Sequence, residues 1–155
     1  MIETYKTKRF LEYHAATVFD THQTDIEFDG IQIKMNIWDT SGMSGMENLR
    51  KLIYQDTDVF VICFDLKNAS WVHDWMNEVR QRRENKAPII LVGTKSDLRS
   101  KVGRRNKYVT YKQGVHLAKD IGAVKYLECS SKNNEGLEAT FQVAAKVGLG
   151  WGYKK

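Results

Sequence analysis

The stretch "PIILVGTKSDL", residues 88–98, decides the fold because a continuous apolar run passes directly into a short polar loop. An unbroken run of aliphatic side chains between polar segments is typical of a strand that other elements cover on both faces. Residues 58–66, "DVFVICFDL", have the same character, and residues 124–132, "VKYLECSSK", form another predicted strand. The predicted helices alternate with these strands and span residues 68–86, 111–121 and 134–147. This alternation predicts an α/β fold with a parallel sheet between two layers of helices.

Two stretches of alternating polar and apolar residues precede these runs. They are "TDIEFDG", residues 24–30, and "IQIKMNIWD", residues 31–39, and Asp29 and Gly30 lie at their junction. An Asp-Gly pair between two alternating stretches is a strong signal for a tight β-turn. The sequence therefore predicts an antiparallel hairpin at the edge of the sheet.

Length and composition indicate one globular domain. The chain has 155 residues, of which 42% are hydrophobic and 28% are charged, with a net charge of +5. Its longest apolar runs are far shorter than the roughly 20 residues that a transmembrane helix needs, and its first residues lack the apolar core of a signal peptide. The two cysteines, Cys63 and Cys129, lie in apolar contexts, so we expect buried, reduced thiols and a reducing compartment.

Basic residues gather in "RQRRENK", residues 80–86, and "KVGRRNK", residues 101–107. Three interpretations are open: a solvated surface, a patch for a protein or phospholipid partner, and a nucleic-acid surface. Neither stretch contains an aromatic ring on which a base could stack. We therefore expect no specific nucleic-acid partner.

Three short polar loops follow predicted strands. They are "DTSG" at 39–42, "TKSD" at 94–97 and "SSK" at 130–132. Each acid alone is compatible with an ordinary helix N-cap or loop position. Because ligands of such sheets bind beyond the carboxyl ends of the strands, the three loops together indicate one ligand site.

These loops resemble those of the Ras-like small GTPases, which belong to the P-loop NTPases, and in particular those of the Rho/Rac subfamily. The resemblance covers about residues 5–147, through "TVFDT" (17–21), "WDTSGM" (38–43), "ILVGTKSDLR" (90–99) and "QGVHLAKDIGAVKYLECSSK" (113–132). It implies a single Rho-like domain over residues 1–155, a three-layer sheet with a hairpin edge, and GTP or GDP with Mg²⁺ as cofactors.

The family's site residues carry over by position. Asp97 matches the acid that accepts hydrogen bonds from guanine, Lys95 the lysine whose stem covers the base, and Ser131 a backbone donor to the base. The resemblance also assigns to the nucleotide site Phe10, Gly42, Thr94, Ser130 and Lys132. It assigns Mg²⁺ to Thr17 and Asp39. Its effector or switch surface comprises Val18, Phe19, Asp20, Met46, Leu49 and Leu52.

Several features depart from the family's pattern. The phosphate loop G-x-x-x-x-G-K-[ST] does not occur in the 155 residues, and the resemblance places Met1 inside the helix that follows that loop. We therefore expect an N-terminally incomplete domain without the first strand. Four lost charge-assisted hydrogen bonds would remove about 6 kcal/mol, or roughly four decades of affinity, so nucleotide binding should be weak.

Met43 stands where the family has the glutamine that orients the attacking water. A thioether cannot hold that water, so we expect defective GTP hydrolysis and no catalytic residue. The C-terminal residues "GWGYKK" contain no cysteine, so no prenyl anchor is expected.

The expected absence of the first strand leaves a gap between residues 31–39 and 58–66. We expect a groove lined by Ile33, Met35, Ile37, Phe60 and Ile62. Three outcomes are open: the two halves close on each other, a partner or a second copy inserts a strand in a strand-exchanged dimer, or the chain stays loosely packed.

The leading interpretation is an atypical Rho/Rac-like GTP-binding signalling protein that is cytoplasmic, or peripheral to a membrane through a partner. The alternative is a nucleotide-independent pseudo-GTPase module that binds effectors or regulators. A basic scaffold for anionic lipid or nucleic acid ranks third, because it has no need of Asp97 and Lys95.

Overall fold

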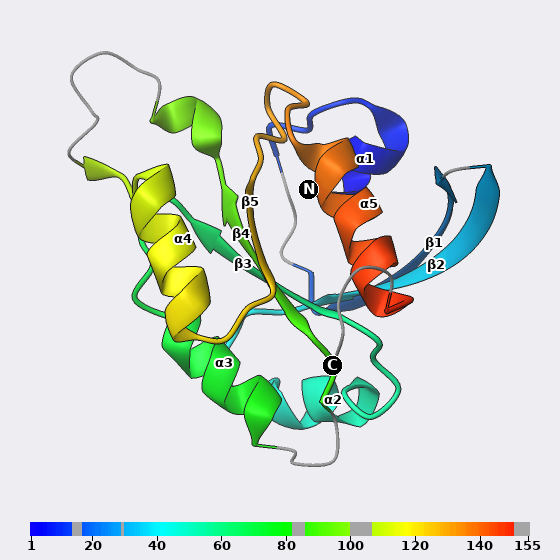
Figure 1. Ribbon diagram of the computed structural model, residues 1–155, viewed down its shortest axis with the longest axis horizontal. Coiled ribbons are helices and arrows are strands. Elements are labelled where there is room, and N and C mark those ends of the chain that lie inside the picture. The colour runs from blue at the N-terminus through cyan, green and yellow to red at the C-terminus, as the bar shows by residue number, and fades with distance from the viewer. Residues whose placement is uncertain (14–16, 29, 82–85, 100–106, 151–155) are drawn as a thin grey trace.

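The computed structural model describes residues 1–13, 17–28, 30–81, 86–99 and 107–150 (Figure 1). The predictions on the basic stretches, on Asp29 and on the C-terminal segment fall largely or wholly outside these ranges. The elements, in order, are α1 (Ile2–Thr7), β1 (Phe19–Phe28), β2 (Ile31–Thr40), α2 (Glu47–Ile53), β3 (Phe60–Asp65), α3 (Val72–Arg80), β4 (Ile89–Thr94), the 3₁₀ helix η1 (Ser96–Leu98), α4 (Tyr111–Asp120), β5 (Lys125–Glu128) and α5 (Leu137–Gly148).

β1 and β2 form the predicted antiparallel hairpin. The register pairs Phe28 with Ile31 at the turn and Phe19 with Thr40 at the open end. Gly30 has a φ of +76°, which glycine adopts without the steric cost that a side chain would add. β1 begins five residues earlier than predicted, so part of the expected effector segment belongs to a strand.

The other strands form a parallel sheet in the order β3-β4-β5. α3 and α4 lie on one face of this sheet, whereas α1 and α5 lie side by side on the other (Figure 1). The ring centroids of Tyr5 in α1 and Phe141 in α5 are 4.1 Å apart. The predicted α/β class, with a parallel sheet and an antiparallel hairpin, is confirmed.

β4 joins the two halves of the core. Ile89 and Leu91 face the cluster under α3 and α4, and Ile90 and Val92 face the cluster under α5. All four side chains are fully buried, and each such burial contributes about 2 kcal/mol. The continuous apolar run predicted this strand correctly because both of its faces are covered.

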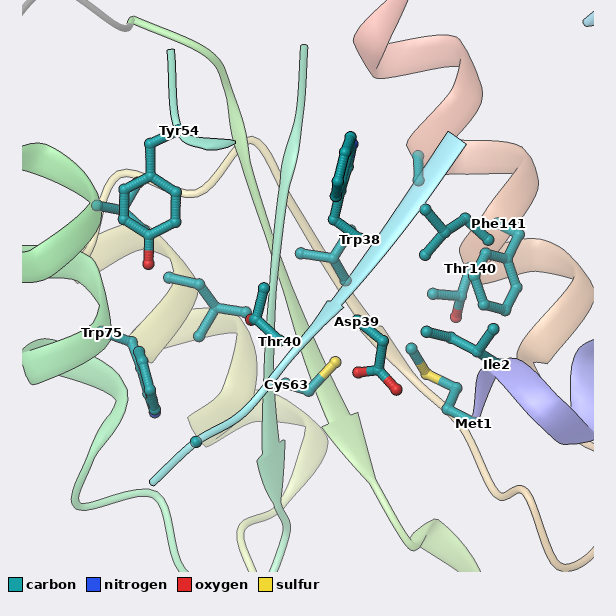
Figure 2. Close-up of a pocket in the computed structure, with 16 residues that line it drawn as sticks. Met1, Ile2, Trp38, Asp39, Thr40, Tyr54, Cys63, Trp75, Thr140 and Phe141 are labelled. Carbon is teal, nitrogen blue, oxygen red and sulfur yellow. The ribbon is translucent and has the colours of Figure 1, made fainter. Parts of the chain in front are cut away.

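β3 differs from the prediction. Phe60, Ile62 and Phe64 are buried, but Val61 is 37% exposed and Cys63 is also exposed. The expectation that this strand is covered on both faces was wrong, as was the expectation that both thiols are buried. Among the described residues β3 pairs with β4 alone, and Val61 and Cys63 line the open cavity between β3 and β2 (Figure 2). Of the predicted groove residues, Ile37 and Ile62 line this cavity, whereas Ile33, Met35 and Phe60 pack into the two cores.

The helices also depart from their predicted limits. α3 is shorter than residues 68–86, and α2 was not predicted at all. α5 begins after Gly136, whose φ of +70° breaks the helix predicted from residue 134. Among the described residues, no helix combines the length and apolar character needed to cross a membrane.

Candidate functional site

The loops that follow β4 and β5 meet at the carboxyl edge of the parallel sheet. The hydroxyl of Ser130 donates to Asp97 Oδ1 at 2.6 Å, and the Ser96 N–H donates to the Cys129 carbonyl at 3.1 Å. Ser130 is completely buried, whereas Asp97 is only half-buried. A buried hydroxyl therefore holds an accessible carboxylate in one orientation.

Lys95 lies at the start of this loop in the left-handed conformation, with a φ of 61°. Its Nζ is 2.9 Å from Oδ2 of Asp65, at the end of β3. Burial raises the pKa of Asp65, but the hydrogen bond from Lys95 and neighbouring groups outweigh it and leave the pKa below its usual value. Sequence reasoning missed Asp65, although its position at a strand end matches that of the three predicted loops.

An ion pair beneath the loops fixes them to β5. The guanidinium of Arg99 forms two hydrogen bonds with the carboxylate of Glu128, one of them at 2.8 Å, and also donates to the Val109 carbonyl. The Tyr126 hydroxyl donates to Glu128 Oε1 at 2.8 Å. Sequence reasoning missed this support, because no local pattern relates residues 29 positions apart.

The remaining predicted base-site residues lie around these loops. Thr94 donates its hydroxyl to the Phe64 carbonyl at 2.9 Å and so joins β4 to β3. Ser131 is half-buried and Lys132 is exposed, in the turn after β5. Phe10 is 45% exposed in the segment after α1.

The two predicted Mg²⁺ ligands are adjacent. Thr17 Oγ1 donates to Asp39 Oδ2 at 3.4 Å, which brings a hydroxyl and a carboxylate oxygen together. Mg²⁺ prefers oxygen ligands, and with nucleotides it takes one or two from the protein and the others from phosphates and water. This pair fits such a partial site. Within the described ranges there is no group of three or more acidic, histidine or cysteine side chains that could hold a metal ion alone.

A buried arginine holds the loop that contains Gly42 and Met43. Arg50 is 3% exposed, and its Nη1 donates to the carbonyls of Ser41 and Met43 at 2.8 and 3.1 Å. Its Nε and Nη2 bind the carboxylate of Glu78 in α3 at 2.8 and 2.7 Å. The guanidinium of Arg50 therefore connects this loop to α2, which contains Arg50, and to α3, which contains Glu78.

The same network lowers the pKa of Glu78. The largest cause of the lower pKa is the hydrogen bond from Arg50, which outweighs the opposite effect of burial. The hydroxyl of Tyr54 donates a hydrogen bond to Glu78 at 2.6 Å, which lowers this pKa further. The guanidinium also lies 4.7 Å from the ring centre of Trp75. None of these residues was predicted, because the partners come from separate helices.

The predicted effector surface is only partly exposed. Val18 is 53% exposed and Leu52 is 70% exposed. Asp20 is exposed as well, whereas the others are half-buried, namely Phe19, Met46 and Leu49. Phe19 packs against Trp38, with ring centres 5.5 Å apart. The role of this surface remains a prediction.

A parallel α/β sheet with such loops at its carboxyl edge is the architecture of nucleotide-binding domains. The model of the Ras family matches residues 1–148, and the chain therefore belongs to the Ras family of small GTP-binding proteins. The resemblance to Ras-like small GTPases is confirmed at this level.

Proposed function

We propose that the chain is an atypical Rho/Rac-like GTP-binding protein that binds guanine nucleotides weakly and does not hydrolyse GTP. The observation that carries the proposal is the 2.6 Å hydrogen bond from Ser130 to Asp97, which leaves one carboxylate oriented at the edge of the sheet. Effectors or regulators of Rho-type proteins are its expected partners.

Base selection follows from the chemistry of this carboxylate. An ionised acid accepts two hydrogen bonds from the ring N–H and the exocyclic amine of guanine, and adenine does not offer this pair of donors. Each charge-assisted bond is worth about 1.5–3 kcal/mol. Lys95, held by Asp65, would lie beside the base.

The residues that would face the phosphates are suited to binding a nucleotide but not to hydrolysing GTP. Thr17 and Asp39 would hold Mg²⁺, which would neutralise charge on the phosphates. The sequence contains no glycine-rich phosphate loop in its 155 residues. Met43 is 55% exposed and presents a thioether where the reaction needs a group that positions water.

A second candidate function, a nucleotide-independent interaction module, is favoured by the Arg50 network. Arg50 and Glu78 hold the loop at 41–43 through protein contacts alone. A loop fixed in this way can present one surface to a partner without a nucleotide.

The experiment that separates the two functions is a titration with fluorescent GDP, ADP and XDP. The first function predicts a preference for GDP over ADP of at least about a hundredfold, from two charge-assisted hydrogen bonds. Asp97→Asn should shift preference towards XDP, because the amide offers a donor where guanine needs an acceptor. The control is Asp74→Asn, on the exposed face of α3. Equal affinity for ADP would contradict guanine selection, and the absence of any binding would favour the second function.

A further inference from the structure

The guanidinium of Arg99, just after η1, is shared between two acceptors from different parts of the chain. Arg99 Nη1 donates to Glu128 Oε1, at the end of β5, and to the Val109 carbonyl, both at 2.8 Å. Val109 in turn donates its N–H to the Leu66 carbonyl, after β3, at 2.7 Å. The side chain of Arg99 is 24% exposed and that of Glu128 is 12% exposed. Arg99 therefore connects the segments that follow all three parallel strands, and its charge is matched by one largely buried carboxylate.

Tyr126 fixes the orientation of the Glu128 carboxylate. Its hydroxyl donates to Glu128 Oε1 at 2.8 Å, and the residue is only 5% exposed. Two glycines make room for this side chain. A Cβ atom at Gly114 in α4 would lie 2.0 Å from the tyrosine ring, and one at Gly93 in β4 would lie 2.7 Å from the hydroxyl oxygen. The packing of α4 and β4 thus holds Tyr126, and Tyr126 holds Glu128 towards Arg99.

Arg99 and Asp97 line the same cavity, which has a volume of about 650 Å³. Glu128 and Glu135 line it as well, and Arg99 is the only cation among the described residues in its walls. A guanidinium attracts nearby carboxylates, and its planar fork of N–H donors matches their two oxygens. Because Arg99 follows Asp97 by two residues, a guanidinium released from Glu128 would have the Asp97 carboxylate as an alternative partner.

We propose that Glu128 is a positioning residue for guanine recognition, because it retains Arg99 and so prevents the guanidinium from pairing with Asp97. This inference rests on the proposed role of Asp97 as the acceptor for guanine. A carboxylate that pairs with Arg99 would be a poorer acceptor for the base, so the pair would compete with the nucleotide. Ion pairs between partly exposed side chains are weak, so this competition should lower the affinity for GDP about fivefold.

Three variants separate this role from a purely structural one in the fluorescent GDP titration. Glu128→Gln releases the guanidinium and should weaken GDP binding about fivefold, and adding Arg99→Met should restore that loss. Urea unfolding should show the opposite order: Arg99→Met alone should lower the midpoint more than Glu128→Gln, because it leaves the more buried carboxylate without its cation. An ion pair that only braces the loops would give affinity losses that follow the stability losses. The matched control is Glu135→Gln, which removes a carboxylate from the same cavity and should change GDP affinity less than about twofold.

A crystal structure of the nucleotide-free Glu128→Gln chain tests the displacement itself. The guanidinium of Arg99 should lie within hydrogen-bond distance of the Asp97 carboxylate. A guanidinium that stays on the Val109 carbonyl while the parental chain binds GDP would overturn this inference alone, as would a double variant that binds GDP no better than Glu128→Gln. If the parental chain binds no GDP, the proposed function fails, and the role of Glu128 in guanine recognition fails with it.

Discussion

The hydroxyl of Ser130 illustrates how one buried side chain determines the presentation of another. It donates to Asp97 and accepts from the Asn133 N–H at 3.1 Å, so it joins the loop after β4 to the turn after β5. The sequence motifs placed both residues at the site through the family resemblance. They could not show that Ser130 acts through Asp97, because that depends on the contact between two loops 33 residues apart.

Ser130→Ala removes the hydrogen bond to Asp97 and also the acceptor for the Asn133 N–H. We expect the free energy of unfolding to fall by about 1–2 kcal/mol, as for the loss of a hydrogen bond to a charged group. GDP affinity should fall about tenfold, since Asp97 loses its fixed orientation. Urea unfolding and the fluorescent titration measure the two effects, with the exposed residue change Ser44→Ala as control. Unchanged GDP affinity in a destabilised Ser130→Ala chain would show that the hydroxyl has only a structural role.

At the scale of elements, α2 and α3 are joined by Arg50 and Glu78. Breaking one member of a buried ion pair leaves an uncompensated charge, which typically costs about 3–5 kcal/mol, whereas replacing both with apolar residues costs far less. Arg50→Met should therefore destabilise the chain more than the double variant Arg50→Met, Glu78→Leu. Comparable losses in the two variants, measured by urea unfolding, would contradict this account.

The ion pair of Arg50 and Glu78 should make the free energy of unfolding fall as the pH falls. The pKa of Glu78 is lowered by the hydrogen bond from Arg50, so the stabilisation is present above the ordinary glutamate pKa of 4.5 and is lost as pH falls through the lower folded value. We expect the urea midpoint to fall between about pH 5 and pH 3, and to fall less in the double variant. Some slope should persist, because the pKa of Asp65 is also lowered. Identical slopes in the two chains would exclude Glu78 as a source.

The strands show where local sequence is sufficient and where it is not. β4 was predicted because its residues carry the pattern of a doubly covered strand themselves. The exposure of Cys63 was not predicted, because the expectation of a buried thiol rested on the apolar run alone and did not take account of the predicted gap beside this strand. α2 was missed because a seven-residue helix is too short for its apolar positions, Leu49, Leu52 and Ile53, to establish a helical period.

For the whole molecule, the residues proposed to bind the base and those proposed to bind Mg²⁺ lie on different sheets. The parallel sheet carries the loops at Asp97 and Ser130, and the hairpin carries Asp39 and leads to Met43. Direct closure of the two halves does not occur in the described residues. The hairpin, the parallel sheet and the gap between residues 31–39 and 58–66 were predicted. The side chains that both helical layers direct into this gap could not be predicted, because they depend on how the helices pack.

The central proposal is that this chain selects guanine nucleotides and does not hydrolyse GTP. Single-turnover phosphate release, with the chain in excess over GTP and with Mg²⁺ present, tests it most directly. The expected rate equals that of buffer, both for the chain and for Met43→Gln, because the cradle that stabilises the transferring phosphoryl group is absent from both sequences. A rate above buffer that excess GDP suppresses and excess ADP does not would contradict the claim.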